Sequence, residues 1–463
     1  MTPEAREIMA YLQKYNLADQ LNVVVNKLCK KRSDDPFGFL ASRLHNLAAP
    51  PVISKIEGRE VLGTCATPTI EVDVHCKVDD NIKFIARGTT SLPPDGKVVS
   101  SPDAKRYRGL GVDGLVNGVS EVLQPQLGGI EPKSQAECDA ALSKVAGAQS
   151  LGNRTINAAS IAICKSAARL GEVECFTHVR SLMEDVKDPS FAIPRPMMQL
   201  IDCRGPGCNL FFRELLVFPL KSKSFKKQLE WCCTLHHQLG NVVSQRYGGT
   251  FKIPTKSGGY APPVSDLSQV LKLIGEAADA GGLSLGEQIG LAISGEGGCW
   301  SAGYLVKQKE GLKSTEDMVK MYISTLKGSS AVHALIDPLA PTDLDGWAKL
   351  KIALMNDKGL SNIITITSDI PKSDLKKVEK AAGGASLDFA EFVTVSGAIK
   401  IAKAAKETKL VTLVSSSAEE SHETFIADFA VGVGATFVKF GGAHGMQNIA
   451  KYNRLLQIES ILD

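Results

Sequence analysis

Short apolar runs rich in β-branched residues recur through the second half of the chain, and a stretch with helical periodicity follows each of them. The runs cover residues 289–294, 332–337, 362–368, 387–393, 409–416 and 436–440. Strands this apolar, separated by helices, are typical of a parallel sheet that is buried on both faces. Residues 189–463 are therefore predicted to form a β/α barrel, with functional side chains at the carboxyl ends of its strands.

The preceding segment, residues 52–188, has a different pattern. Strand-like runs cover residues 52–62, 69–75 and 82–86, and helical periods such as 156–170 come later. Strands that precede the helices, rather than alternating with them, predict an α+β domain. Two consecutive prolines, Pro50 and Pro51, stop a preceding helix and mark the linker before this domain.

Residues 1–48 show the periodicity of two short amphipathic helices joined by a turn at Asn16 and Leu17. In the second helix, which Asp19 is placed to cap, apolar side chains recur at i, i+3, i+4 and i+7 and form one stripe. The stripe consists of Leu21, Val24, Val25 and Leu28. A helical hairpin this short cannot bury its apolar face alone, so we expect it to pair with a second copy.

Residues 11–44 resemble the RIIa-type dimerisation and docking module of protein kinase A regulatory subunits. The motif is matched by Tyr11, Leu12, Arg32, Asp35, Pro36 and the run from Phe39 to Ala41, with Ser33 in place of the family's proline. The resemblance implies a homodimer or hetero-assembly that holds an amphipathic anchoring helix of a partner protein. Such modules recur in cilia and sperm flagella, which implies axonemal partners and that location. The implied docking residues are Leu12, Leu21, Val24, Val25, Leu28, Phe39 and Leu40.

Composition excludes several classes of function. A formal charge of +3 on 463 residues provides no basic field for nucleic acid or an anionic membrane. Eleven scattered cysteines, in a chain too long to need disulfides, predict reduced thiols and a cytoplasmic protein. No membrane span is expected, because the longest apolar stretch, residues 425–443, is interrupted by Asp428 and Lys439.

The body of the chain, from Arg59 to the C-terminus, resembles the enolases. The motifs that carry the resemblance are REVLGTCATPTIEVDV, LFFRELLVFP, SGGYAP, ALIDP, ETFIADFAVG and IAKYNRLLQIE. The resemblance implies an α+β domain that caps a barrel, with a ββαα start before the βα repeats. It also implies a reaction in which a lysine base removes a proton next to a carboxylate while Mg²⁺ holds the ene-diolate.

Most positions that this reaction uses in enolases carry other residues here. By the resemblance, the three metal-binding carboxylates fall on Ala292, Ile336 and Ser368. The base lysine falls on Asp388, the general-acid glutamate on Ser257, and two active-site histidines on Gly205 and Ser416. Glu214 and Lys439 keep the family's residue types. The resemblance therefore implies no metal site, no cofactor and no working catalytic set.

Two details of this site stay open at the level of sequence. Asp337 and Asp369 each lie one residue beyond a lost ligand, but neighbouring strand residues face opposite sides, so they would serve only after a register change. Glu214 and Lys439 could bind an anion, but buried polar groups are normally satisfied within the protein. This favours a pair between them, or with Asp388.

The sequence leaves three functions open. The first is a catalytically inactive enolase-like scaffold of the cilium or flagellum, docked through its N-terminal module. The alternative is a divergent phosphopyruvate hydratase that converts 2-phosphoglycerate to phosphoenolpyruvate in glycolysis, and Mg²⁺ is required only under this alternative. A third possibility is a sensor that binds a phosphorylated metabolite without converting it.

Overall fold

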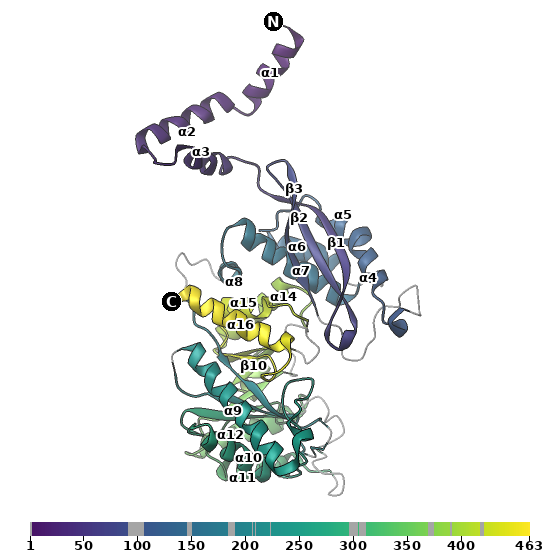
Figure 1. Cartoon of the computed structure of the whole chain (residues 1–463), viewed down its shortest axis with the longest axis vertical. Helices are drawn as coiled ribbons and strands as arrows, with labels where there is room; N and C mark the ends of the chain where they lie inside the picture. The colour runs from purple at the N-terminus through teal and green to yellow at the C-terminus, as the bar shows by residue number, and fades with distance from the viewer. Residues whose placement is uncertain are drawn as a thin grey trace.

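The computed structural model describes residues 2–90, 106–145, 151–183, 190–205, 207–208, 210–222, 224–295, 304, 312–368, 375–388, 391–416 and 421–463. Figure 1 shows three parts in succession: helices at the N-terminal end, a small domain built on a twisted sheet, and the barrel at the far end. Within these ranges, no helix is both long and apolar enough to cross a membrane.

The N-terminal part contains three helices, whereas the hydrophobic pattern predicted two. They are α1 (Pro3–Lys14), α2 (Leu17–Lys31) and α3 (Pro36–His45). The additional helix, α3, starts at a cap in which the Asp35 carboxylate accepts a hydrogen bond from the Gly38 backbone N at 2.8 Å. Figure 1 shows α2 and α3 folded back on each other, while α1 leads away from them.

The prediction that Asp19 caps α2 was wrong. The N-cap is Asn16, which makes no side-chain cap hydrogen bond. Asn16 has φ 47°, in the left-handed region that asparagine tolerates better than most residues, and this conformation turns the chain between α1 and α2. Asp19 lies in the first turn of α2, where its charge complements the helix dipole.

The small domain is built on an antiparallel sheet in the order β1 (Val52–Leu62), β2 (Pro68–Val78) and β3 (Asn81–Thr89). Its helical segments are Thr64–Ala66, Arg106–Gly109, α4 (Asp113–Gly118), the π-turn Val119–Leu123, α5 (Gln124–Leu127), α6 (Gln135–Val145), α7 (Gly152–Leu170) and α8 (Cys175–Met183). Helix α7 packs closely on the sheet at Gly88, because a Cβ there would lie 2.3 Å from the Ala158 carbonyl oxygen.

The barrel strands are β4 (Arg195–Pro196), β5 (Met198–Asp202), β6 (Glu214–Pro219), β7 (Ile289–Ser294), β8 (Val332–Ile336), β9 (Ile364–Thr367), β10 (Gly384–Asp388), β11 (Val411–Ser415) and β12 (Phe437–Lys439). Met197 alone separates β4, which pairs with β12, from β5, which pairs with β6, so the sheet closes on itself. Strand β6 runs antiparallel to both neighbours, and the strands from β7 to β12 run parallel to one another.

Two helices, α9 (Phe225–Tyr247) and α10 (Leu267–Ala280), follow β6 before β7 begins. The predicted barrel with a ββαα start and an α+β cap is therefore confirmed. The remaining helices are the turn Gly249–Lys252, α11 (Thr315–Lys327), α12 (Leu344–Asn356), α13 (Leu375–Ala381), α14 (Val395–Glu407), α15 (Phe425–Val433) and α16 (Met446–Leu462).

One predicted strand was misplaced. The apolar run 387–393 was expected to form a strand, but β10 begins at Gly384 and ends at Asp388. Pairing with both neighbours, β9 and β11, selects this segment despite its glycine and alanine. The side chain of residue 388 consequently lies at the strand's end rather than near its start.

The cap domain and the barrel share a hydrophobic core where α8 lies against α15. Phe176 and Val179 of α8 belong to the same buried cluster as Phe425 and Phe429 of α15. A Cβ on Gly432 would lie 2.5 Å from the Val179 side chain, so the glycine allows the helices to approach. This contact holds the cap domain against the barrel.

Candidate functional site

Apolar side chains fill the interior of the barrel. We call this set the interior plug; it consists of Met197, Leu216, Phe218, Ala292, Ala334, Ile336, Ile366, Leu413 and Phe437, each no more than 1% exposed. The strand register explains how three of them come together, since Leu216 pairs with Ala292 and Ala292 pairs with Ala334. Two of the three positions aligned with enolase metal ligands, Ala292 and Ile336, therefore lie inside a buried apolar cluster.

The residues at these positions do not fit Mg²⁺. Magnesium takes oxygen ligands in near-octahedral geometry, and the side chains of Ala292 and Ile336 supply no oxygen. Ser368, the third position, donates its hydroxyl hydrogen to a carboxylate of Asp337. Among the residues that the structure describes, no group of three or more His, Cys, Asp or Glu side chains is placed to hold a metal ion.

Asp337 follows β8 in a left-handed conformation, φ 45°, and is 6% exposed. Its carboxylate accepts hydrogen bonds from the backbone N of Ser368, at 2.7 Å, and from the Ser368 hydroxyl. The Asp337 side chain is therefore tied to the end of the neighbouring strand. Asp369, the other carboxylate considered for a register change, lies outside the described residues.

Glu214 and Lys439 form the pair that was favoured from the sequence. The Lys439 Nζ lies 2.7 Å from Glu214 Oε1, and the Gln199 side-chain amide donates to Glu214 Oε2 at 2.8 Å. Burial raises the pKa of Glu214, but the positive charges of Lys439 and Arg213 more than offset this, so its pKa lies below the ordinary value. Both retained side chains thus satisfy each other across the barrel.

Ser257 and Gly205 lie around a second buried carboxylate, Asp202, at the end of β5. The hydroxyls of Ser257 and Thr255 donate to Asp202 Oδ2 at 2.7 and 2.8 Å. A Cβ on Gly205 would lie 2.4 Å from Cβ of Ala261, so this loop has no room for the histidine found in enolases. Asp202 was not predicted as a site residue; its place at a strand's carboxyl end was the available signal.

The last two sequence-predicted positions, Asp388 and Ser416, lie on the other side of the mouth. Asp388 is half-buried at the end of β10, in register with Ser415. The backbone N of Ser416 donates to the Lys439 carbonyl at 3.0 Å, and its hydroxyl is buried without a hydrogen-bond partner among the described residues. A neutral serine hydroxyl is too weak a base to take a carbon-bound proton, and a carboxylate is a weaker base than a lysine amine, so neither residue is equivalent to the lysine of enolases.

Comparison with known proteins accounts for this architecture. Residues 190–463 match the family model for the enolase C-terminal TIM barrel domain, and residues 53–179 match that for the enolase N-terminal domain. The chain belongs to the enolase family. It is 27% identical to cytosolic enolase 3 of Arabidopsis thaliana over 470 residues, covering 98% of this chain and 96% of the relative. It is 26% identical to enolase 4 of Xenopus laevis over 529 residues, covering 98% of this chain and 90% of the relative.

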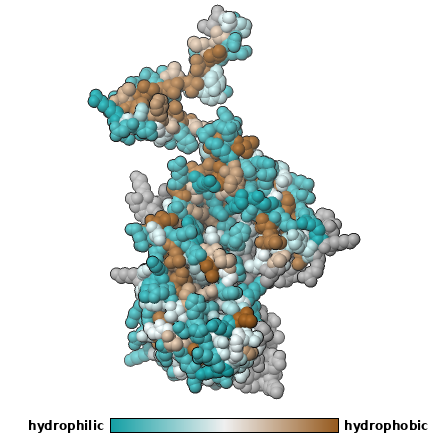
Figure 2. Space-filling model, viewed as in Figure 1, coloured by the Kyte–Doolittle hydropathy of each residue, from teal (hydrophilic) through white to brown (hydrophobic). Residues whose placement is uncertain are grey.

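Outside the two enolase domains, the N-terminal helices expose many apolar side chains, which Figure 2 shows as brown atoms along this end of the molecule. Of the predicted docking residues, Leu12, Leu21 and Val25 are exposed, Leu28, Phe39 and Leu40 are half-buried, and Val24 is 5% exposed. Further exposed apolar side chains on these helices are Ile8, Met9, Tyr11, Tyr15, Val23, Phe37 and Leu44. Two of the four stripe residues on α2, Leu21 and Val25, are thus exposed in the single chain.

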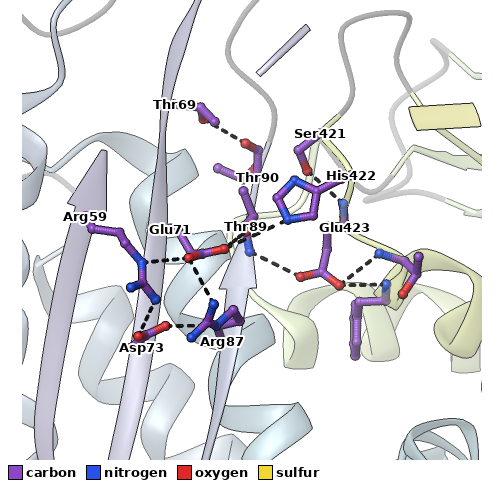
Figure 3. Close-up of polar contacts among 12 residues, drawn as sticks. Arg59, Thr69, Glu71, Asp73, Arg87, Thr89, Thr90, Ser421, His422 and Glu423 are labelled. Carbon is purple, nitrogen blue, oxygen red and sulfur yellow. Dashed lines mark hydrogen bonds and ion pairs between the residues drawn. The ribbon is translucent and has the colours of Figure 1, made fainter. Parts of the chain in front are cut away.

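A charged cluster joins the cap domain to the enolase barrel (Figure 3). Its centre is Glu71 on β2, whose carboxylate lies 2.7 Å from Arg59 Nε, 3.7 Å from Arg87 Nη1 and 3.9 Å from His422 Nε2. Asp73 also pairs with both arginines. Sequence reasoning missed this cluster, because it depends on three strands and a distant loop meeting.

Glu423, which precedes α15 of the barrel, extends this cluster by binding residues of the cap domain. Its carboxylate accepts from the Thr89 backbone N at 3.2 Å and from the Lys165 Nζ at 3.0 Å, and it also accepts from the Phe425 backbone N at 3.0 Å. Burial raises the pKa of Glu423, but the Lys165 ammonium outweighs it, so its pKa lies below the ordinary value. One carboxylate therefore ties β3 and α7 to the start of α15.

Proposed function

We propose that this protein is a catalytically inactive member of the enolase family that works as a scaffold in the axoneme of a cilium or flagellum, assembled through its N-terminal helices. One observation carries the proposal: the interior plug includes Ala292 and Ile336, two positions where enolase chemistry would require carboxylates. A barrel whose metal positions are apolar and buried has lost the charge that stabilises the ene-diolate.

The usual rate contributions of the missing catalytic groups support the proposed loss of activity. A general base contributes about 10² to 10⁴ in rate, and a catalytic metal contributes several kcal/mol of charge stabilisation. Each ~1.4 kcal/mol corresponds to about tenfold in rate. Losses at the metal, the base and the general acid together remove essentially the whole enhancement, even though they do not add independently.

The N-terminal helices support assembly. Leu21 and Val25, which follow one another on one face of α2, are 46% and 45% exposed in the single chain. Burial of a fully exposed Leu or Val side chain contributes about 1.5–3 kcal/mol, so covering the part of each that is still exposed contributes about half of that. We propose that a second copy of these helices covers the stripe first, and that the resulting dimer then binds an amphipathic helix of an anchoring protein.

Sedimentation of the full-length protein tests the assembly. Leu21→Asp should weaken self-association and abolish capture by amphipathic anchoring peptides, whereas Asn26→Asp, the same charge change on the exposed opposite face of α2, should leave both unchanged. Because enolase-fold bodies can also associate, peptide capture is the more specific readout. Equal behaviour of the two variants would contradict docking through the stripe.

Localisation tests the cellular part of the proposal. A tagged full-length copy should concentrate along the axoneme of a ciliated cell, and the Leu21→Asp variant should spread through the cell body. An even distribution of the unmodified chain would contradict an axonemal role while leaving the structural argument about the barrel in place.

A divergent phosphopyruvate hydratase is the second candidate. The observation that favours it is the survival of Glu214 and Lys439 at the mouth, with Asp337 buried close to a former ligand position. If the chain converts 2-phosphoglycerate, the rate should depend on Mg²⁺ and fall at least about tenfold in Asp337→Asn, as expected for a lost charge-assisted contact in the transition state.

A further inference from the structure

The apolar stripe of α2 ends in basic residues. Lys31, the last residue of the helix, lies seven positions after Val24 and three after Leu28, so it continues the stripe by one turn. Arg32, which ends α2 in a left-handed conformation, lies four positions after Leu28. A partner helix that lies along the stripe therefore meets positive charge where α2 ends. In Figure 2, hydrophilic atoms cover the outer end of this helix pair, beyond the hydrophobic ones.

Helix α3 gathers a second cation at the same place. The Phe39 ring lies beneath two charged side chains, with Lys31 Nζ and Arg43 Cζ each 5.4 Å from the ring centroid. Contact with an aromatic face attracts a cation and restricts a side chain that would otherwise move freely in solvent. Phe39 itself is half-buried, whereas Lys31 and Arg43 are exposed. The two charges are therefore held together at the end of the stripe and remain accessible.

Carboxylates of the chain do not neutralise this end of the hairpin. From residue 27 to residue 43 the sequence has five cations and two carboxylates. One of the carboxylates, Asp35, caps α3 by accepting a hydrogen bond from the Gly38 backbone N at 2.8 Å. In the part of the chain that the structure describes, none of the five cations forms an ion pair. They are Lys27, Lys30, Lys31, Arg32 and Arg43.

An anionic membrane is the competing partner for a basic amphipathic helix. Helices that lie on membranes are rich in Lys and Arg on the polar face, opposite the apolar one. On α2 that face carries Asp19 and Lys30, whose charges cancel, and two amides, Asn22 and Asn26, which hydrogen-bond to each other at 3.1 Å. The positive charge lies instead at the end of the stripe, which fits a helix with an apolar face and an acidic end.

We propose that the amphipathic helix held by the N-terminal module carries acidic side chains where it lies over the end of α2, and that Lys31 and Arg32 pair with them. This inference rests on the docking function proposed above and specifies the charge of the partner. Apolar contact along Leu21 and Val25 provides affinity for many amphipathic helices, and the basic end selects among them by charge.

Binding of two designed peptides to the full-length protein tests the proposal. Both are amphipathic helices of the length of α2 with leucines along one face, and they carry either glutamates or lysines at the two ends of that face. The glutamate peptide should bind about tenfold more tightly in fluorescence anisotropy at low salt, and added salt should reduce the difference, because exposed charges are screened. Equal affinities would overturn the proposal while leaving docking intact, and binding of neither peptide would overturn both.

Two charge reversals in the last turn of α2 locate the effect. Lys31→Glu should weaken binding of the glutamate peptide about fivefold and strengthen binding of the lysine peptide. Lys30→Glu, the matched control, makes the same change on the face away from the stripe and should leave the ratio of the two affinities unchanged. An equal change in both variants would overturn the pairing at Lys31, because it would reflect overall charge.

A competition experiment separates a partner helix from a membrane surface. Vesicles of phosphatidylcholine and phosphatidylserine should not displace the glutamate peptide from the full-length protein at physiological salt. Displacement by these vesicles would overturn the proposal and assign the basic end of α2 to a lipid surface.

Discussion

The barrel mouth and the N-terminal helices differ in how their side chains find partners: polar groups at the mouth pair within the chain, whereas apolar groups on the helices are left exposed to solvent. At the mouth, groups that an enolase would present to substrate bind one another: Lys439 pairs with Glu214, Ser257 donates to Asp202, and Ser368 donates to Asp337. In the N-terminal helices, apolar groups such as Leu21 and Phe37, the latter 80% exposed, lack cover within the chain.

This difference bears on two kinds of function, catalysis and association. A site prepared for a reaction keeps polar groups under-satisfied until substrate arrives, and a surface prepared for association keeps apolar area exposed until a partner arrives. By that measure our proposal assigns association to the N-terminal helices and a supporting role to the barrel. The following predictions test each half of the contrast.

The largest expected effect is at the mouth. Glu214→Gln should lower the free energy of unfolding by about 3–5 kcal/mol, because it leaves the Lys439 ammonium buried without its partner. Chemical denaturation of full-length protein measures this. Glu214→Leu combined with Lys439→Met should recover most of the loss, since an apolar pair replaces a buried ion pair at little cost.

A surface pair provides the control for that experiment. Lys227 and Glu230 lie 2.6 Å apart on α9 with about half of each side chain exposed. Glu230→Gln should change stability by less than about 1 kcal/mol. If Glu214→Gln lowers the free energy of unfolding by no more than Glu230→Gln does, water reaches the ion pair at the mouth. The polar groups of the mouth would then depend less on one another than the comparison with the N-terminal helices requires.

The second effect concerns association. Leu21→Asp should raise the dissociation constant of the N-terminal assembly at least about 100-fold, because each copy would place a charge in an apolar contact. Analytical ultracentrifugation of the full chain measures it, and α-helical content by circular dichroism should remain unchanged, because Leu21 is exposed in the single chain. A dimer as strong as that of Asn26→Asp would show that another surface holds the copies together.

A smaller change in stability is expected at Gly205, and it tests how tightly the loop after β5 is packed. Gly205→Ala should cost about 1–3 kcal/mol, because its Cβ would lie 2.4 Å from Cβ of Ala261. Gly275→Ala, on α10 with open space around it, is the control and should be neutral or stabilising by about 0.5–1 kcal/mol. Equal stability of the two variants would indicate that the loop has room for a larger residue.

The smallest effect is the response to acid at the domain boundary. The pKa of Glu423 is lowered in the folded protein, so its ion pair with Lys165 contributes stability that is complete above the ordinary pKa of 4.5 and is lost as pH falls through the lower, folded value. Glu423→Gln should therefore flatten the decline of melting temperature below pH 4.5. An unchanged decline would mean that other carboxylates, such as Glu214, account for it.

Much of the fold followed from hydrophobic pattern, and the exceptions have physical causes. Strands β7, β8 and β11 were found because β-branched runs fill a buried parallel sheet. Strand β10 was misplaced because Gly384 and Ala385 have low strand propensity and are held by pairing with both neighbours. Helix α3 was missed although Asp35 followed by Pro36 is a helix-start signal.

The site was predictable in part. A pair between Glu214 and Lys439 followed from the need to satisfy inward polar groups, although 225 positions separate the residues. The contact between Asp337 and Ser368 was not foreseen, because it depends on the left-handed conformation of Asp337 after β8. The cluster around Glu71 and Glu423 requires the packing of two domains, which no local pattern encodes.

The most direct test of the inert barrel is an assay of the full-length protein with 2-phosphoglycerate and Mg²⁺, followed by the absorbance of phosphoenolpyruvate. The account predicts no rise above the rate without protein, at any Mg²⁺ concentration. A rise that depends on Mg²⁺ and disappears in Asp337→Asn would contradict it, because the chain would then supply a metal site that the interior plug leaves no room for.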